Sequence, residues 1–285
     1  MRLCRFDDNR LGLVQGESVR DVTPVLRPLP AHRWSFPMGD PVLAALDALK
    51  PEIVAEAERA PAQPLAAVKL LAPVANPSKI VCAPVNYLRH LQEGRADPGI
   101  HHGKQVEEIE RVGLFLKATS ALVGPSEGVA LRHLDRRNDH EIELVMVIGR
   151  HADRVPRKGA LAHVAGYAIG LDMTIRGPED RSLRKSVDSY AVVGPWMVTA
   201  DEIADPANLS LSLEVNGEPR QRANTRDLVL DLERLIELAS SYYTLQPGDL
   251  IFSGTPEGVG PVKPGDVLTA SIDGVGSMRV EIRAA

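Results

Sequence analysis

Two glutamates at the start of an apolar stretch are the first residues whose types and spacing could perform chemistry. In DHEIELVMVIG (139–149), Glu141 and Glu143 introduce an otherwise apolar run rich in β-branched residues, which predicts a buried strand. A strand alternates faces, so both carboxylates point the same way, with α-carbons roughly 6.6 Å apart. Carboxylates this close repel unless a proton or a cation lies between them. The alternative is a solvated strand end at which each acid meets an arginine such as Arg136 or Arg137.

A third carboxylate ends another strand-like run. GYAIGLDMT (166–174) leads through small apolar residues to Asp172. Together with Glu141 and Glu143 it would form an all-oxygen set, without a cysteine or a histidine at ligand spacing. Such a set suits a hard cation such as Mg²⁺, Mn²⁺ or Ca²⁺. The alternative is that Asp172 only caps a turn or a helix.

A histidine and a glutamate in KIVCAPVNYLRHLQEG (79–94) could activate water. If YLRHLQE is helical, His90 and Glu93 lie three residues apart on one face and can touch. A carboxylate orients an imidazole and raises its basicity, which prepares a general base. The alternative is an ordinary exposed pair on a helix surface. His101 and His102 are interpreted as a solvated loop pair.

The segment RGPEDRSLRKSVDSYAVVGPW (176–196) carries further charged candidates: Arg176, Glu179, Arg184 and Lys185. An enclosed lysine there would stabilise an enolate or a carboxylate; otherwise the segment is a solvated loop. The glycine-rich GTPEGVG lacks the lysine and the spacing of a phosphate loop. Without a GxSxG or a GxGxxG motif, serine hydrolases and nicotinamide enzymes lose their usual sequence signals.

The elements that must position these residues fall into two parts. With 285 residues, the chain is long enough for one large domain or for one large and one small domain. We expect a small N-terminal module over residues 1–72 and a catalytic domain over 73–285. In the module, RLCRF and RLGLVQG predict strands, VLAALDALKPEIVAEAERA predicts a helix interrupted by proline, and APAQPLAAV (60–68) predicts a linker or extended connection.

The larger part is predicted to be rich in strands. Asn216-Gly217 and Asp273-Gly274 each lie between alternating segments and predict hairpins. Apolar residues at helical spacing in LVLDLERLIELASSYYTL (228–245) predict a helix before the strand DLIFSGTP. Strands with few helices indicate an α+β, mainly β, fold.

Composition excludes several classes of protein. Hydrophobic residues make up 44% and charged residues 25%, an ordinary globular balance. The net charge of −5 provides no basic face for nucleic acid. Cys4 and Cys82 lack metal-ligand spacing, which fits a reducing cytoplasm. The N-terminus has no apolar signal region, and no run is long enough to span a membrane. We therefore expect a soluble, cytoplasmic protein.

Eight segments in a fixed order resemble the fumarylacetoacetate hydrolase family. They are NYLRHLQE, LFLKATSALVGP, DHEIELVMVIG, GYAIGLDMT, RKSVDSY, GPWMVTADEI, NGEPRQ and PGDLIFSGTPEGVG. They cover about residues 78–285, and together they are far more specific than any one motif. The resemblance implies that family's mixed β-sheet roll, a variable N-terminal module and a homodimer.

The resemblance also implies roles for the acids and the dyad. Glu141, Glu143 and Asp172 match the family's Mg²⁺ or Mn²⁺ ligands, and Ca²⁺ could occupy the same site in a crystal. His90 and Glu93 match its HxxE dyad, which lies on a lid that closes over the substrate.

Four more positions follow from the resemblance, one of them a departure from the common pattern. Lys185 matches the active-site lysine, and Arg176 and Thr255 fall where the family contacts substrate oxygens. After Asp172 the family often reads DVSARDLQ or DMTARDVQ, whereas this chain reads DMTIRGPED, so Glu179 replaces a substrate-binding glutamine. An ionised carboxylate cannot donate a hydrogen bond as an amide does. We therefore expect this substrate contact to differ.

The implied reaction is metal-dependent hydrolysis of a carbon–carbon bond in a β-diketo acid. The substrate would be a small oxo acid similar to an acylpyruvate or fumarylpyruvate, from aromatic or sugar-acid catabolism. The family also suggests two alternatives at the same site, oxaloacetate-type decarboxylation and 2-hydroxyhepta-2,4-diene-1,7-dioate-type isomerisation. A non-catalytic binding protein would have no reason to retain the whole set, and a structural Ca²⁺ protein would not explain His90 or Lys185.

Overall fold

One long sheet runs through the molecule. The computed structural model describes residues 1–31 and 38–285. Within this part the strand order of the sheet is β4-β3-β2-β1-β14-β12-β11-β17-β6-β7, with β5 paired to β1 and β8 paired to β14. Its strands are β1 (Arg2–Phe6), β2 (Arg10–Gln15), β3 (Ser18–Asp21), β4 (Ala62–Pro64), β5 (Leu70–Leu71), β6 (Ile80–Cys82), β7 (Phe115–Lys117), β8 (Leu122–Val123), β11 (Ile142–Ile148), β12 (Val164–Asp172), β14 (Ala191–Thr199) and β17 (Leu250–Phe252).

Two smaller sheets and a few helices complete the described structure, which is α+β and mainly β as predicted. One small sheet contains β13 (Thr174–Ile175), β10 (Asn138–His140) and β18 (Gly260–Pro261). The other has the order β16 (Glu218–Asn224), β15 (Ser210–Val215), β19 (Val267–Ile272), β20 (Gly276–Ala284) and β9 (Val129–Leu131). The α-helices are α1 (Pro41–Ala44), α2 (Leu46–Arg59), α3 (Leu88–Ala96), α4 (Pro98–His101), α5 (Ile109–Val112), α6 (Arg181–Lys185) and α7 (Leu232–Tyr242). None of the helices in the described residues is long and apolar enough to cross a membrane.

Both predicted hairpins are present. β15 and β16 pair across Asn216 and Gly217, whose φ angles of 54° and 81° are left-handed. Such angles are required at both central residues of a two-residue turn of this type. β19 and β20 pair around Asp273 and Gly274, and Ile272 lies opposite Gly276. The predicted helix is also present, beginning at Leu232 after Asp231, whose side chain accepts from Arg234 N.

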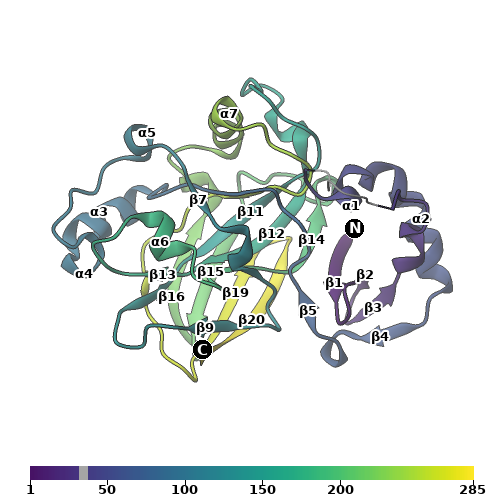
Figure 1. The fold of residues 1–285 in the computed structure, drawn as a ribbon, viewed down its shortest axis with the longest axis horizontal. Coiled ribbons are helices and arrows are strands. Elements are labelled where there is room, and N and C mark those ends of the chain that lie inside the picture. The colour runs from purple at the N-terminus through teal and green to yellow at the C-terminus, as the bar shows by residue number, and fades with distance from the viewer. Residues whose placement is uncertain (32–37) are drawn as a thin grey trace.

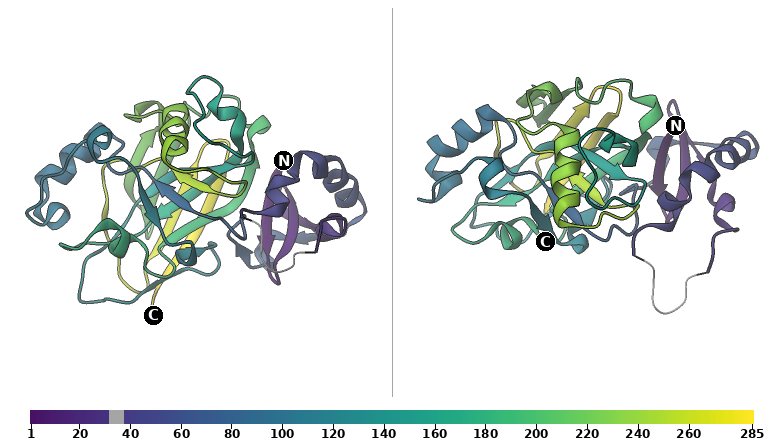
Figure 2. Two further views of the ribbon diagram at one scale, coloured as in Figure 1. Left: turned by 45° about the horizontal axis from the view of Figure 1, so that its top comes forward. Right: turned by 90° about the horizontal axis from the view of Figure 1, so that it is seen from above.

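The N-terminal segment joins the same sheet as the strands that follow it. β1 pairs with β14 on one side and with β2 on the other. Figures 1 and 2 show the segment at one end of the molecule, with α3 and α4 at the opposite end. The division into residues 1–72 and 73–285 stays a prediction, and residues 32–37 of the expected module lie outside the described residues.

One expectation for the N-terminal segment is wrong, and another is decided between its two alternatives. Pro51 does not interrupt its helix: it lies inside α2, and the break comes earlier, at Ala45. Proline removes only one helical hydrogen bond, and the buried face around Ile53 keeps the helix packed. The stretch 60–68 is the extended connection rather than the linker, because it contains β4, which pairs with β3.

The central strand β11 is buried along its whole length, and all of its residues except Glu143 are apolar because both of its faces are covered. Leu144 and Met146 belong to the core cluster shared with the five-stranded sheet. Val145 and Val147 belong to the cluster that includes the N-terminal strands and helices. Glu143 has the parity of Val145, so its side chain leaves the strand on that second face. On this second face, the row of apolar side chains of β11 therefore ends in a buried carboxyl group, that of Glu143.

Candidate active site

The three predicted acids converge at one end of β11 and β12. Glu141 and Asp172 are cross-strand neighbours, because Asp172 N donates to Glu141 O at 2.9 Å. The three side chains each offer one carboxylate oxygen, and these oxygens all lie within 4.8 Å of one another. All three residues are at most 3% exposed. The set is therefore a compact, buried group of oxygen ligands on two adjacent strands.

Neither arginine of the solvated alternative contacts the two glutamates. Arg136 binds Glu179 instead, and Arg137 binds Asp97 and Asp139. With Glu141 and Glu143 buried, the solvated strand end is wrong. The reason is that the strand continues the sheet interior rather than reaching the surface.

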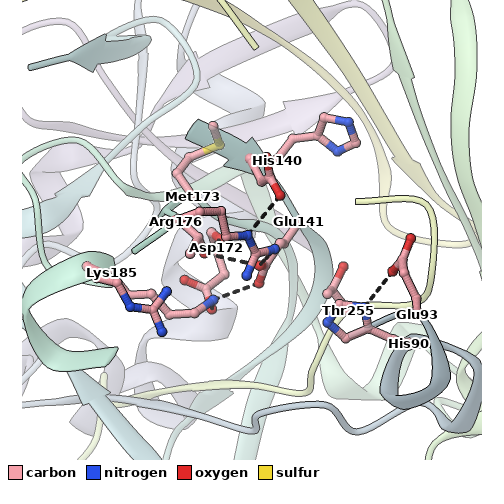
Figure 3. A network of polar contacts seen from close by, with 12 residues as sticks. His90, Glu93, His140, Glu141, Asp172, Met173, Arg176, Lys185 and Thr255 are labelled. Atoms are coloured by element: carbon pink, nitrogen blue, oxygen red, sulfur yellow. Dashed lines mark hydrogen bonds and ion pairs between the residues drawn. The ribbon is translucent and has the colours of Figure 1, made fainter. Parts of the chain in front are cut away.

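Two other cations contact Glu141. Lys185 Nζ lies 2.7 Å from Glu141 Oε2 and 2.7 Å from Asp172 Oδ2, so the ammonium bridges two of the three acids. Arg176 reaches Glu141 Oε1 at 2.9 Å and Asp139 Oδ2 at 2.8 Å. Figure 3 shows Lys185 and Arg176 close to Glu141 and Asp172, with His90 and Glu93 beyond Glu141 in this view.

Glu143 is the acid without a cation. Among the described residues it forms no ion pair, and its Oε2 accepts only Gly254 N at 2.6 Å. Gly254 has a φ of +100°, and a β-carbon there would meet Asn86 Cβ at 2.6 Å, so the approach needs glycine. Burial and the neighbouring charge of Asp172 raise the pKa of Glu143 well above its usual value. In contrast, burial would raise the pKa of Glu141, but the charges of Lys185 and Arg176 outweigh it and lower that pKa.

These charges fit a divalent cation. A buried carboxyl with no cationic partner must hold a proton or lie beside another positive charge. Glu143 is such a group, and it shares its cavity with two ionised neighbours. Mg²⁺ and Mn²⁺ favour oxygen ligands. Glu141, Glu143 and Asp172 therefore present the donor type that a hard divalent ion requires, and Glu143 adds a carboxyl that no ion pair compensates in the described residues.

The dyad predicted on the helix is formed. His90 Nδ1 lies 2.8 Å from Glu93 Oε2 on α3, and Glu93 Oε1 accepts Gly258 N at 2.9 Å. His90 is buried and lines the same cavity as the acids. When Nδ1 carries the proton donated to Glu93, Nε2 is left free to accept one.

Thr255 lies in the cavity wall, held by a residue that sequence reasoning missed. Its Oγ1 accepts from Gln221 Nε2 at 2.8 Å. Gln221 Oε1 in turn accepts Ile142 N at 3.1 Å, between the two glutamates. Gln221 therefore links the loop that contains Thr255 to the segment that carries Glu141 and Glu143. The sequence feature that could have identified Gln221 was its position at the end of the NGEPRQ segment.

Lys117 is a second residue that sequence reasoning missed. It is buried on β7, and its Nζ donates to Asp172 Oδ1 and, at 3.3 Å, to Met173 O. Asp172 therefore contacts two lysines, Lys117 through Oδ1 and Lys185 through Oδ2. The available signal was a lysine in the otherwise apolar stretch LFLKATSALVGP.

Glu179 is engaged with a partner of its own. Arg136 binds it with two nitrogens, Nη1 to Oε1 at 3.1 Å and Nη2 to Oε2 at 2.8 Å. A β-carbon at Gly177 would lie 1.9 Å from Arg136 Nη2 and 2.4 Å from Glu179 Oε2. The residues that depart from the family pattern therefore act together: Gly177 has no side chain, which leaves room for the ion pair between Arg136 and Glu179. Glu179 as a direct substrate ligand stays a prediction.

One cavity connects the predicted residues. Its volume is about 270 Å³, and its lining includes the three acids, His90, Arg176, Glu179, Lys185 and Thr255. Glu93 lies behind His90 and does not line the cavity. Three acids, a histidine and a lysine around one cavity can hold a cation, remove a proton from water and stabilise a developing oxyanion.

The chain is similar to one family profile and to several known proteins. The family profile described as fumarylacetoacetate (FAA) hydrolase C-terminal matches residues 79–283. A maleylpyruvate hydrolase of Aquipseudomonas alcaligenes is 57% identical over 286 residues, covering 100% of both chains. An oxaloacetate tautomerase of Bos taurus is 37% identical over 233 residues, covering 77% of this chain and 71% of the relative.

A solved structure is similar over the full length. It is a maleylpyruvate hydrolase from Sphingobium sp. SYK-6 in complex with a manganese(II) ion and pyruvate. It has a TM-score of 0.84 and 40% sequence identity, and the match covers 100% of each chain.

Proposed function

Since the chain belongs to the fumarylacetoacetate hydrolase family, we propose that its substrate is maleylpyruvate, a 2,4-dioxo diacid. The enzyme is a divalent-metal-dependent hydrolase that cleaves a carbon–carbon bond of a β-diketo acid. The observation that carries the proposal is the buried set of Glu141, Glu143 and Asp172 in one cavity with His90 and Lys185. The full-length similarity to maleylpyruvate hydrolases supports the choice of substrate.

Glu141, Glu143 and Asp172 would hold the ion, which is Mg²⁺ or Mn²⁺. When bound, it supplies a Lewis acid for the 2-oxo acid end of the substrate. Lys185 places a positive charge beside the same acids and next to Phe115, whose ring centroid is 5.3 Å from Nζ. Its role is to stabilise negative charge that develops on the pyruvate part.

His90 prepares the attacking water. Its Nε2 takes one proton from the water, while Glu93 fixes the ring and stabilises the imidazolium. The hydroxide oxygen bonds to C4 of the substrate, and the bond between C3 and C4 breaks. The bonding pair leaves with C3 as pyruvate enolate, which then takes the proton. The products are pyruvate and maleate, whose new carboxylic acid group releases one proton to solvent, so atoms and charge balance without another reactant.

The proposal extends to the setting of the enzyme. The resemblance to the family supports a homodimer, use of Mg²⁺ as well as Mn²⁺, and a place in catabolism. Cys4 and Cys82 are buried free thiols, which is compatible with a reducing cytoplasm. Light scattering of the purified protein would give the oligomeric state.

The experiment that tests this function compares three substrates. The purified protein is incubated with Mn²⁺ or Mg²⁺, with and without chelator, on maleylpyruvate, acetylpyruvate and oxaloacetate. Pyruvate and maleate in equal amounts from maleylpyruvate, lost with chelator, are expected. Carbon dioxide from oxaloacetate alone would replace the proposal with a decarboxylase. Conversion between tautomers or isomers without cleavage would replace it with an isomerase.

Replacement of His90 by alanine is expected to lower kcat for maleylpyruvate by about 10²- to 10⁴-fold, the usual contribution of a general base. Mn²⁺ affinity should stay within about threefold, because His90 is not among the clustered acids. Any oxaloacetate decarboxylation should fall less, because it requires no activated water. Steady-state kinetics and calorimetric titration with Mn²⁺ measure both quantities. Equal losses in hydrolysis and decarboxylation would contradict the water-activating role.

A further inference from the structure

The short helix α6 directs its cations toward the cavity. Arg181, Arg184 and Lys185 occur at positions i, i+3 and i+4, which share one face of a helix, and all three line the cavity. Ser182 and Leu183 are exposed, Leu183 with 64% of its surface. Only Lys185 belongs to the set that contacts the acids. The two arginines add further positive charge to the cavity wall beside Lys185.

In the part of the chain that the structure describes, neither arginine forms an ion pair with an acid. Arg184 donates from Nε to Glu179 O at 2.9 Å and from Nη1 to Ile175 O at 3.2 Å. Both acceptors are uncharged carbonyls, so they orient the guanidinium without cancelling its charge. Arg181 forms no hydrogen bond or ion pair with any residue in 1–31 or 38–285. Two cations of the cavity wall are therefore available to an anion.

The two acids directly before α6 in the sequence, Glu179 and Asp180, are already engaged. Glu179 is bound by Arg136 through both oxygens. Asp180 caps α6, since its Oδ1 accepts Ser182 N at 2.9 Å and Ser182 Oγ at 3.0 Å. Burial lowers the pKa of Arg181 and of Arg184, as expected for charges partly removed from water without a counterion. An incoming carboxylate would supply that counterion.

We propose that Arg181 and Arg184 form a subsite for the carboxylate at the far end of the dioxo diacid, away from its 2-oxo acid group. The inference rests on the proposed function and adds the residues that select a diacid. A guanidinium matches a carboxylate with two parallel hydrogen bonds, and such bonds are strong where water is partly excluded. A substrate with a neutral acyl end would leave both arginines without that partner. The subsite therefore favours dicarboxylates over simple acylpyruvates.

The test compares maleylpyruvate with acetylpyruvate, which has the same 2,4-dioxo acid group but no second carboxylate. Arg181→Met is expected to lower kcat/KM for maleylpyruvate by about 10- to 100-fold, the range for one charge-assisted hydrogen bond. The effect should lie mainly in KM. Activity on acetylpyruvate should stay within about threefold, which also shows that the variant folds. Arg181→Lys should retain part of the preference.

A matched control is Arg279→Met on β20, since Arg279 is an exposed arginine paired with Glu281 and does not line the cavity. This variant should leave kcat/KM unchanged for both substrates. An equal loss on both substrates in Arg181→Met, or no loss on maleylpyruvate, would overturn the subsite.

A binding measurement separates failure of the subsite from failure of the proposed function. Maleate, which carries the far carboxylate, is titrated into the wild type and into Arg181→Met. Weaker binding by the variant is expected even if the wild type hydrolyses neither dioxo acid, a result that would reject the function alone. Absent or unchanged maleate binding would reject the subsite.

Discussion

Replacement of Glu143 by alanine is expected to lower metal-dependent turnover of maleylpyruvate by about a thousandfold or more. A bound divalent ion contributes several kcal/mol of stabilisation to the transition state, and each 1.36 kcal/mol corresponds to a factor of ten in rate. Glu143 is the member of the cluster that has no ion pair with a cation among residues 1–31 and 38–285. Its removal should therefore weaken Mn²⁺ binding strongly, which calorimetric titration and kinetics with added Mn²⁺ would measure.

The metal-free variant should fold at least as well as the wild type. The substitution removes a buried carboxyl whose raised pKa reports an unfavourable environment for its charge. Ligand binding stabilises only the state that binds it, so the rise in Tm on adding Mn²⁺ should disappear in Glu143→Ala. Glu179→Gln is the matched control, an acid of the same cavity outside the cluster. Undiminished turnover and an unchanged Mn²⁺ response in Glu143→Ala would remove the ligand assignment.

Replacement of Lys185 by methionine is expected to lower kcat by about 10²- to 10³-fold, as for loss of one group that stabilises an oxyanion. The variant should keep its Mn²⁺ affinity or bind Mn²⁺ more tightly. The reason is that the ammonium bridges Glu141 and Asp172 at 2.7 Å and 2.7 Å, so it adds positive charge beside the ion. Methionine keeps most of the length of the lysine side chain but removes its charge. Kinetics at saturating Mn²⁺ separate the two effects.

Lys104→Met provides the control for Lys185. Lys104 also lines the cavity, but it is exposed and donates to Pro178 O rather than to the acids. It should leave kcat within a few fold. If Lys185→Met lost activity only in proportion to weaker Mn²⁺ binding, its role would be to hold the acids and not to stabilise the reacting pyruvate part.

Local pattern was enough to predict how the acids are presented. Strand parity alone predicted that Glu141 and Glu143 point the same way, and the apolar run predicted that β11 is buried. The i, i+3 spacing likewise predicted contact between His90 and Glu93, which lie 2.8 Å apart. These are short-range features, set by the geometry of a single strand or helix.

The partners of the acids could not be predicted in the same way. Lys117 reaches Asp172 across 55 residues, and Gln221 reaches Ile142 across 79 residues. Such contacts depend on the order of strands in the sheets, which residue spacing does not encode. The pairing of Arg136 with Glu179 is another example, because its geometry depends on how two loops meet beside Gly177. Pro51 is a further example. The tertiary packing of α2 outweighs the local tendency of proline to break a helix, so the helix continues through Pro51.

The most direct test of a metal-dependent hydrolase at this site is the rate of pyruvate release from maleylpyruvate as Mn²⁺ is returned to metal-stripped protein. The account predicts negligible release without metal and a rise that saturates at one ion per chain, with maleate formed in equal amount. Full release by the stripped protein, or cleavage that never follows the added ion, would contradict it.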